Sequence, residues 1–238
     1  MGAFVEHALE DRRPHNLREK AYDSFTRHLL AREIRAGQFI SQRELVEITG
    51  LSLGAIRELI PRLEAEGLVR TVPQRGMQIA HVDLNLIKDA FQFRLFLECQ
   101  AVAIFALEAP APTVAALKSR HDSIFARCVE AEAKRGITPK LIAEAQDIDW
   151  DLHASIVDSL GNAIISDAYR VNSIKIRLIR QQQTRLNDGV VIPTMREHLA
   201  VIDAIATREP DRASEALRRH ILSARDRAIG LPLTAGHG

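Results

Sequence analysis

The chain has 238 residues, of which 46% are hydrophobic and 26% are charged, and its formal net charge is +1. This length suits one large domain or two small ones. The even charge balance means that nucleic-acid binding cannot be argued from bulk charge. No apolar run approaches the roughly 18 residues of a transmembrane helix, and the start has no signal-peptide pattern, so we expect a cytoplasmic protein without a membrane partner. Cys99 and Cys128 lack paired spacing and are expected to be buried free thiols.

The N-terminal part, residues 17–82, has the pattern of a small helical domain that ends in a β-hairpin. Helices are expected over about residues 17–36, 41–48 and 53–66. The second helix opens with Ser41 and Glu44, three residues apart, which is the spacing of a capping box. The β-prone runs GLVRTV and GMQIAHV flank the turn PQR, and this arrangement indicates two short strands over residues 67–82.

From residue 84 onward almost the whole sequence has the 3.6-residue period of helices, with glycine and proline at the breaks. The expected helices cover residues 84–109, 112–134, 139–160, 162–186, 193–207 and 210–229. We therefore predict a mainly α protein: a winged helix-turn-helix domain over 17–82, followed by an all-α bundle of six to seven helices over 83–229. Residues 1–16 and 230–238 are expected to be flexible ends.

Helix, tight turn, helix and two-stranded wing is the plan of a winged helix-turn-helix DNA reader. In this plan the helix over 53–66 enters the major groove, and the hairpin forms the wing. The candidate DNA-binding residues are Arg43, Ser52, Arg57, Arg75 and Gly76. The same pattern also fits an alternative, a three-helix protein-interaction module with a solvated arginine face.

Four side chains in the C-terminal part could hold a metal ion. Asp149 and His153 are four residues apart, so both project from one face of their helix. His198 and His220 lie beside the apolar stripes of two later helices. Three imidazoles and a carboxylate suit Zn²⁺, Ni²⁺ or Mn²⁺, with an open position for water or a small anion. The alternative is that each histidine is a hydrogen-bonded core residue.

The other histidines lack comparable neighbours and are expected to be surface or structural residues: His7, His15, His28, His81, His121 and His237.

Two polar residues on inward-facing stripes could bind a small organic acid beside the metal. Arg94 could pair with its carboxylate through two parallel hydrogen bonds, although an intrahelical pair with Glu98 is an equal alternative. Asn172 could contribute as well, and its alternative is a buried structural hydrogen bond. Three arginines are predicted to form a solvated polar face: Arg170, Arg177 and Arg180.

The segment SQRELVEITGLSLGAIRELIPRLEAEGLVRTVPQRGMQI resembles the winged-helix domain of GntR-type bacterial transcription regulators. By this resemblance, four residues sit where family members contact operator DNA: Arg43, Ser52, Arg57 and Gly76. The segment departs from the family at Leu53 and Gly54, since an arginine usually follows the turn serine. A guanine contact of this kind is worth about 1–3 kcal/mol of discrimination, so the resemblance does not carry over an operator sequence.

The C-terminal part is similar to the FCD ligand domain of the FadR subgroup, over most of residues 84–229. The similarity lies in FRLFLECQAVAIFA, in the aspartate and histidine before SLGN, in EHLAVIDAI and in the later RRH. It implies that Asp149, His153, His198 and His220 hold a divalent metal, which in turn holds a carboxylate effector.

Together these features predict a transcription regulator that binds operator DNA as a homodimer and responds to a small carboxylate metabolite. A metal-dependent enzyme acting on an organic acid is one alternative, but no HExxH pattern, paired glutamates or nucleophile elbow supplies its chemistry. A second alternative is an effector-binding protein that has lost its DNA reader. We expect a regulator rather than an enzyme.

Overall fold

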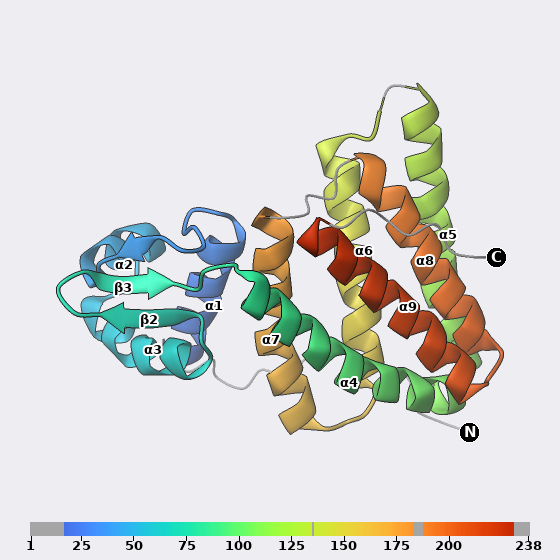
Figure 1. Cartoon of the computed structure of the whole chain (residues 1–238), viewed down its shortest axis with the longest axis horizontal. Coiled ribbons are helices and arrows are strands. Elements are labelled where there is room, and N and C mark those ends of the chain that lie inside the picture. Colours follow the sequence, from blue (N-terminus) through green and yellow to red (C-terminus); the bar gives the residue numbers. More distant parts are fainter. Residues whose placement is uncertain (1–16, 135, 183–187, 231–238) are drawn as a thin grey trace, which may run out of the picture. The chain divides into compact units, whose positions relative to one another are not determined.

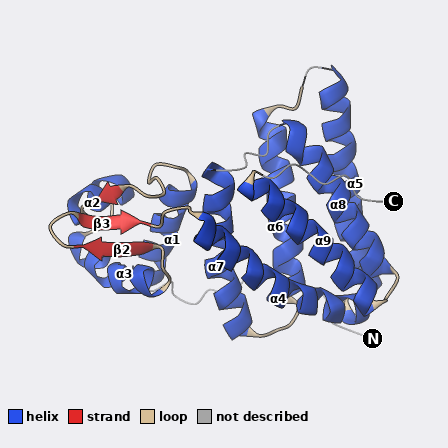
Figure 2. Cartoon of the chain, in the orientation of Figure 1, coloured by secondary structure: helices blue, strands red, loops and turns tan. Residues whose placement is uncertain are grey.

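A computed structural model describes residues 17–134, 136–182 and 188–230 of the chain. The chain divides into two compact units, residues 1–81 and 82–238. Within the described ranges both units are mainly helical, and the strands form one small sheet in the N-terminal unit (Figure 1, Figure 2). The predicted class, a winged helix-turn-helix followed by a helical bundle, is confirmed. Of the predicted flexible ends, residues 1–16 and 230–238, all but Gly230 lie outside the described ranges, and Gly230 is the C-cap of the last helix.

The N-terminal unit contains three helices and three short strands. In chain order they are α1 (Leu17–Leu30), β1 (Phe39–Ile40), α2 (Gln42–Thr49), α3 (Leu53–Ala65), β2 (Val69–Val72) and β3 (Gly76–Ile79). The helices pack around apolar side chains with no exposed surface: Ala21, Phe25, Leu29, Leu45, Ile56 and Leu63. The α1 residues recur every four positions and the α3 residues are seven positions apart, so each of these two helices presents one apolar face to this core.

Side-chain caps define the starts of α2 and α3. Ser41 Oγ accepts a hydrogen bond from Glu44 N (3.1 Å), and the Glu44 carboxylate accepts one from Ser41 N (2.7 Å), so the predicted capping box is confirmed. Ser52 Oγ accepts from Ala55 N (3.2 Å) at the start of α3. Each cap satisfies backbone groups that the first helical turn leaves unpaired.

The wing has one strand more than predicted. The sheet order is β1-β3-β2, and both pairings are antiparallel, with Ile40 opposite Met77 and Val69 opposite Ile79. The added strand β1 is only two residues long, which is too short for a period-two pattern to be visible in the sequence.

The C-terminal unit consists, in its described ranges, of six helices. They are α4 (Leu84–Glu108), α5 (Ala111–Lys134), α6 (Pro139–Asp158), α7 (Ala163–Gln182), α8 (Asp188–Ala206) and α9 (Pro210–Ile229). Helix α4 packs along α9, α8 packs against both α9 and α5, and α6 contacts α4, α5, α7 and α8 (Figure 1). Cys99 and Cys128 are buried free thiols, as predicted.

Helix α8 begins earlier than predicted. The proline in this region indicated a start at Pro193, whereas the helix begins at Asp188 and contains that proline. A proline inside a helix removes one backbone hydrogen bond. The extra turn buries Val191 and Ile192 in the core, and this burial offsets the lost bond.

Helix α4 is long and apolar enough to cross a membrane by length and composition alone, but half of its most apolar segment is buried in the bundle.

The last turn of α4 is capped by a side chain from elsewhere in the chain. Arg208, in the turn between α8 and α9, donates hydrogen bonds to Ala106 O (3.0 Å) and Ala109 O (2.6 Å). Arg208 has a left-handed backbone conformation, with φ of 62°. A cation at the carboxyl end of a helix also interacts favourably with the helix dipole.

Gly76 is required by the sheet itself. Its φ is +85°, and a Cβ atom there would lie 2.9 Å from Ile40 O on the neighbouring strand. We expect Gly76→Ala to lower the free energy of unfolding by about 1–3 kcal/mol, because it combines left-handed strain with a backbone clash. Gly54→Ala is the matched control, since its Cβ would meet only Ser52 Oγ at 3.9 Å. It should leave stability unchanged or raise it by up to about 1 kcal/mol. Urea unfolding followed by circular dichroism measures both, and equal stability of the two variants would contradict the prediction.

Candidate metal centre

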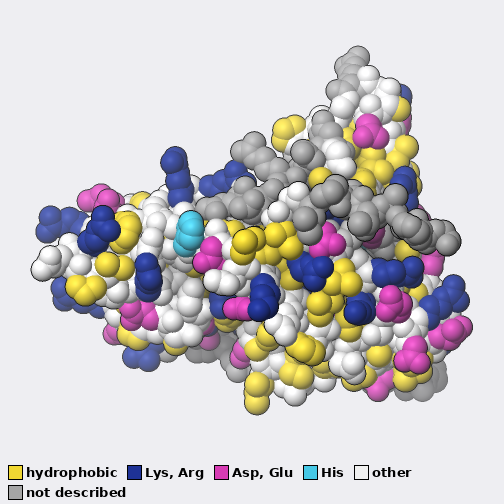
Figure 3. Space-filling view, viewed as in Figure 1, with side chains coloured by type: hydrophobic (Ala, Val, Ile, Leu, Met, Phe, Trp, Pro, Cys, Tyr) yellow, Lys and Arg dark blue, Asp and Glu magenta, His cyan; other side chains and the backbone are white. Residues whose placement is uncertain are grey.

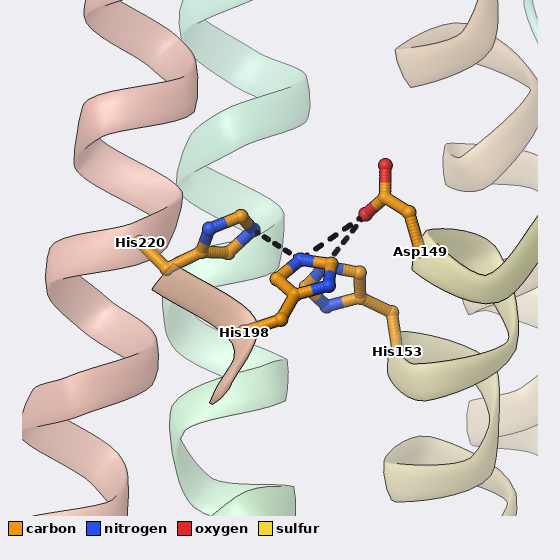
Figure 4. A group of neighbouring side chains, drawn as sticks. All are labelled: Asp149, His153, His198 and His220. Atoms are coloured by element: carbon orange, nitrogen blue, oxygen red, sulfur yellow. Dashed lines mark hydrogen bonds and ion pairs between the residues drawn. The ribbon is translucent and has the colours of Figure 1, made fainter. Parts of the chain in front are cut away.

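Four buried side chains from three helices meet inside the C-terminal unit. Helix α6 supplies Asp149 and His153, α8 supplies His198 and α9 supplies His220 (Figure 4). Each is at most 1% exposed. Each offers one possible ligand atom, and these four atoms lie within 4.8 Å of one another. The four residues together form a possible metal site.

The separations between the facing atoms fit a coordination sphere. His198 Nε2 lies 3.2 Å from His220 Nε2 and 3.3 Å from Asp149 Oδ1, and His153 Nε2 lies 3.5 Å from the same Oδ1. A tetrahedral ion with bonds of about 2.0–2.1 Å separates its ligand atoms by roughly 3.3–3.4 Å. Asp149 Oδ1 is buried and has no hydrogen-bond partner among the described residues. Such an orphaned acceptor, facing ring nitrogens, fits a site for a cation.

The electrostatics leave Asp149, His198 and His220 in the forms that bind metals. Burial, and then the neighbouring His220, lowers the pKa of His198 to about 3, and burial lowers the pKa of His220 to about 4. Burial opposes ionisation of Asp149, but the charge of Arg180 and the imidazole neighbours hold its pKa well below the usual value. At neutral pH His198 and His220 are therefore neutral, with lone pairs available, and Asp149 is ionised.

A carboxylate behind His153 fixes the orientation of its ring. His153 Nδ1 is 2.7 Å from Glu98 Oε2, so the ring donates there and its Nε2 is left facing Asp149. Glu98 is paired in turn with Arg94, whose Nε donates to Oε1 at 2.6 Å. Arg94 thus forms the intrahelical pair with Glu98 that was the alternative to effector binding. Its Nη2 also lies 3.0 Å from His153 Nε2, while its buried Nη1 has no partner among the described residues.

A second carboxylate orients His220 in the same way. His220 Nδ1 is 2.8 Å from Glu197 Oε2, and Glu197 also accepts hydrogen bonds from Ser223 and from both terminal nitrogens of Arg227. These contacts hold the pKa of Glu197 below its usual value, although burial acts in the opposite direction. Carboxylate–histidine pairs of this kind fix the tautomer and the ring orientation of metal ligands.

The prediction that three arginines of α7 form a solvated face is wrong for two of them. Arg180 is 9% exposed, and its Nη1 donates to Asp149 Oδ2. Arg177 is partly buried, and its guanidinium lies 4.8 Å from the centre of the Trp150 ring. Only Arg170 is exposed, in an ion pair with Asp167. A buried carboxylate requires a cation, and α7 is the helix that brings one to Asp149.

His121 was predicted to lack neighbours comparable to those of the cluster, but it lies next to His198. It is 1% exposed, and its ring centre lies 5.5 Å from that of His198. Burial, followed by the field of His198, lowers its pKa to about 4.

Asn172 makes a structural hydrogen bond, from Nδ2 to Ala90 O on α4 (3.1 Å). This bond was the alternative to effector binding.

The candidate DNA-binding residues lie on the exposed surface of the N-terminal unit. Arg43, Ser52 and Arg57 are exposed on α2 and at the start of α3, and Arg57 Nε donates to Gln42 Oε1 (3.2 Å). Arg75 is exposed at the tip of the wing, with its guanidinium over the ring of Phe39 at 4.7 Å.

Sequence reasoning missed several side chains that support the four candidate ligands. They are Arg180, Glu197, Ser223 and Arg227. For two of them a helical signal was available: Ser223 and Arg227 follow His220 by three and seven residues and share its face. Glu197 and Arg180 gave no such signal, because their partners lie on other helices.

A winged helix-turn-helix unit, followed by a helical unit that buries a cluster of histidines and an aspartate, defines a class of bacterial transcription regulators. Comparison with known families agrees: residues 17–79 match the gntR family of bacterial regulatory proteins, and residues 89–223 match the FCD domain. The chain belongs to the GntR family and carries a C-terminal FCD domain. These families and the relatives below are transcription regulators, not enzymes.

Among curated relatives, the chain is 23% identical over 208 residues to the HTH-type transcriptional regulator BphR of Paraburkholderia xenovorans, covering 87% of this chain and 83% of that protein. It is 25% identical over 190 residues to the Nta operon transcriptional regulator of Aminobacter aminovorans, covering 79% and 82%. Among solved structures, a GntR regulator from Rhodococcus sp. RHA1 has a TM-score of 0.69 and 16% identity, covering 89% of this chain and 97% of that one. At this identity the last similarity concerns the fold alone.

The site predicts a difference between two aspartates of α6. Asp149→Asn should weaken Zn²⁺ binding by at least about tenfold, because it removes the only anionic candidate ligand. Asp151→Asn, two residues further on, alters an exposed residue paired with Arg120 and should leave the affinity unchanged. Competition with a chromophoric chelator at constant pH measures both affinities. Undiminished Zn²⁺ binding by Asp149→Asn would remove Asp149 from the ligand set.

Proposed function

We propose that this GntR-type regulator binds operator DNA under the control of a small carboxylate metabolite. The metabolite binds at a divalent ion, Zn²⁺, Ni²⁺ or Mn²⁺, held by Asp149, His153, His198 and His220. The observation that carries the proposal is the buried cluster of three imidazoles and an ionised carboxylate, in which Asp149 Oδ1 is an orphaned acceptor and His198 and His220 are neutral. Four protein ligands leave room for a further ligand where the ion expands its coordination number.

Arg94 supports a carboxylate as the effector. Its guanidinium touches the ring of His153, and its buried Nη1 has no partner among the described residues. One effector oxygen would bind the metal, and the other would accept a hydrogen bond from Nη1. A charge-assisted bond of this kind is stronger than a neutral one. Asn172 has a structural role toward α4, and its contribution to the effector stays a prediction.

The DNA-binding face comprises Arg43, Ser52, Arg57, Arg75 and Gly76. On the face drawn in Figure 3, the N-terminal unit exposes several Lys and Arg side chains, with Asp and Glu side chains between them. Arginine suits both phosphates and guanine edges. The start of α3 would enter the major groove with Leu53 and Gly54 where relatives usually carry an arginine.

We infer a homodimer that works in the cytoplasm. One small reading head has limited affinity, and two heads on an inverted repeat combine theirs. The effector would change the distance between the heads. By linkage, an effector that weakens DNA binding must itself bind less tightly to the DNA-bound form.

Selection of bound sequences from a random DNA library tests the proposal. We expect enrichment of an inverted repeat, whose two halves report the dimer. Removing the metal with a chelator, or adding small carboxylates to the metal-loaded protein, should then change the affinity for that repeat. No enrichment by the folded, metal-loaded protein would overturn the DNA-reading role. An affinity indifferent to metal and to carboxylates would overturn the effector mechanism.

Arg57→Ala should weaken binding to the selected repeat by about 10- to 100-fold, because it removes a donor from the reading helix. Arg62→Ala is the control on the same helix: Arg62 lies five residues further on, pairs with Glu66 and covers the ring of Tyr22. Fluorescence anisotropy with labelled DNA at fixed salt measures both variants. If the two lose affinity equally, α3 does not read the operator through Arg57.

A further inference from the structure

Two of the three histidines in the cluster have an acceptor behind them, and the third does not. His153 donates to Glu98 and His220 donates to Glu197, through Nδ1 in both cases. His198 turns its Nε2 toward Asp149 and His220. Its Nδ1 is buried and has no hydrogen-bond partner among the described residues. A metal-binding imidazole with Nε2 at the ion carries its proton on Nδ1, and that N–H then needs an acceptor.

His121 offers such an acceptor. Its Nδ1 is 2.7 Å from Leu117 O, one turn earlier on α5, so this nitrogen carries the proton and donates to the carbonyl. The lone pair is therefore on Nε2. That nitrogen is buried and has no hydrogen-bond partner among the described residues. The rings of His121 and His198 have centres 5.5 Å apart and planes inclined at 59°.

Thr194 completes a group of three orphaned polar atoms. It precedes His198 by four residues on α8, so it lies on the same face. It has no exposed surface, and its Oγ1 has no partner among the described residues. The group therefore contains a donor on His198, an acceptor on His121, and a hydroxyl that can serve either. Buried polar groups left unpaired are costly, so these three atoms, on neighbouring rings and on one face of α8, are expected to be satisfied together.

We propose that His121 is the positioning residue of His198: its Nε2 accepts the hydrogen bond of the His198 Nδ1–H group across one buried water that Thr194 also binds. This proposal rests on the proposed metal-binding function. It gives each of the three imidazoles its own orienting acceptor, from α4 for His153, from α8 for His220 and from α5 for His198. His121 itself does not bind the metal.

Two substitutions distinguish the roles of the two ring nitrogens of His121. The amide of His121→Asn reaches the Nδ1 position and keeps the bond to Leu117 O, but it offers nothing at Nε2. His121→Gln is one methylene longer, and its amide oxygen reaches the Nε2 position. We expect the asparagine variant to bind Zn²⁺ about 10- to 100-fold more weakly. The glutamine variant should bind close to the wild type.

The readouts are Zn²⁺ affinity, by competition with a chelator, and the visible absorption of the Co²⁺-loaded full-length protein. The Co²⁺ spectrum should change in His121→Asn and be restored in His121→Gln, which a general loss of packing would not produce. Wild-type affinity and spectrum in both variants would overturn the proposal and leave the metal site intact. Unchanged metal binding with lost carboxylate binding would also overturn it, by assigning His121 to the effector. If His198→Ala binds Zn²⁺ as the wild type does, the proposed metal function fails instead.

Discussion

The C-terminal unit depends on the cost of placing an ionised carboxylate in an apolar interior. Asp149 has no exposed surface, and an unpaired charge at such a position would strongly destabilise the bundle. Its Oδ2 accepts a hydrogen bond from Arg180, while its Oδ1 faces imidazole nitrogens. The neighbouring charges repeat this arrangement, since Glu98 is paired with Arg94 and Glu197 with Arg227. The composition of the site therefore follows from one requirement, that each buried charge has a partner.

The buried polar and charged side chains around the cluster come both from the ligand-bearing helices α6, α8 and α9 and from helices that supply no candidate ligand. Helix α4 contributes Arg94 and Glu98, α5 contributes His121, and α7 contributes Arg180. A change in any of these helices can therefore alter the cluster without touching a candidate ligand. Conversely, an ion that draws the four side chains together acts on the packing of every helix of the unit described.

Much of this arrangement could be predicted from the sequence, for identifiable reasons. Asp149 and His153 share a helix face by spacing alone, and the Ser41 and Glu44 cap is a local motif. The ion pair of Arg94 with Glu98 was visible as an i, i+4 alternative. Arg180 was assigned to the wrong face because the apolar stripe of α7 gives no sign that a carboxylate on α6 requires a cation. Glu197 and His121 were missed for the same reason: their roles come from contacts between helices, and a single helix pattern does not contain them.

Arg208 reverses the usual preference for glycine at a left-handed position. Glycine would adopt its φ of 62° without strain, but it has no side chain to reach Ala106 O and Ala109 O. The backbone at this turn is strained, and the Arg208 side chain links the hairpin of α8 and α9 to the end of α4. This position can therefore serve as a marker in related sequences. An arginine there indicates a hairpin tied to α4 in this way, whereas a glycine indicates one that turns freely and holds His198 and His220 by other contacts.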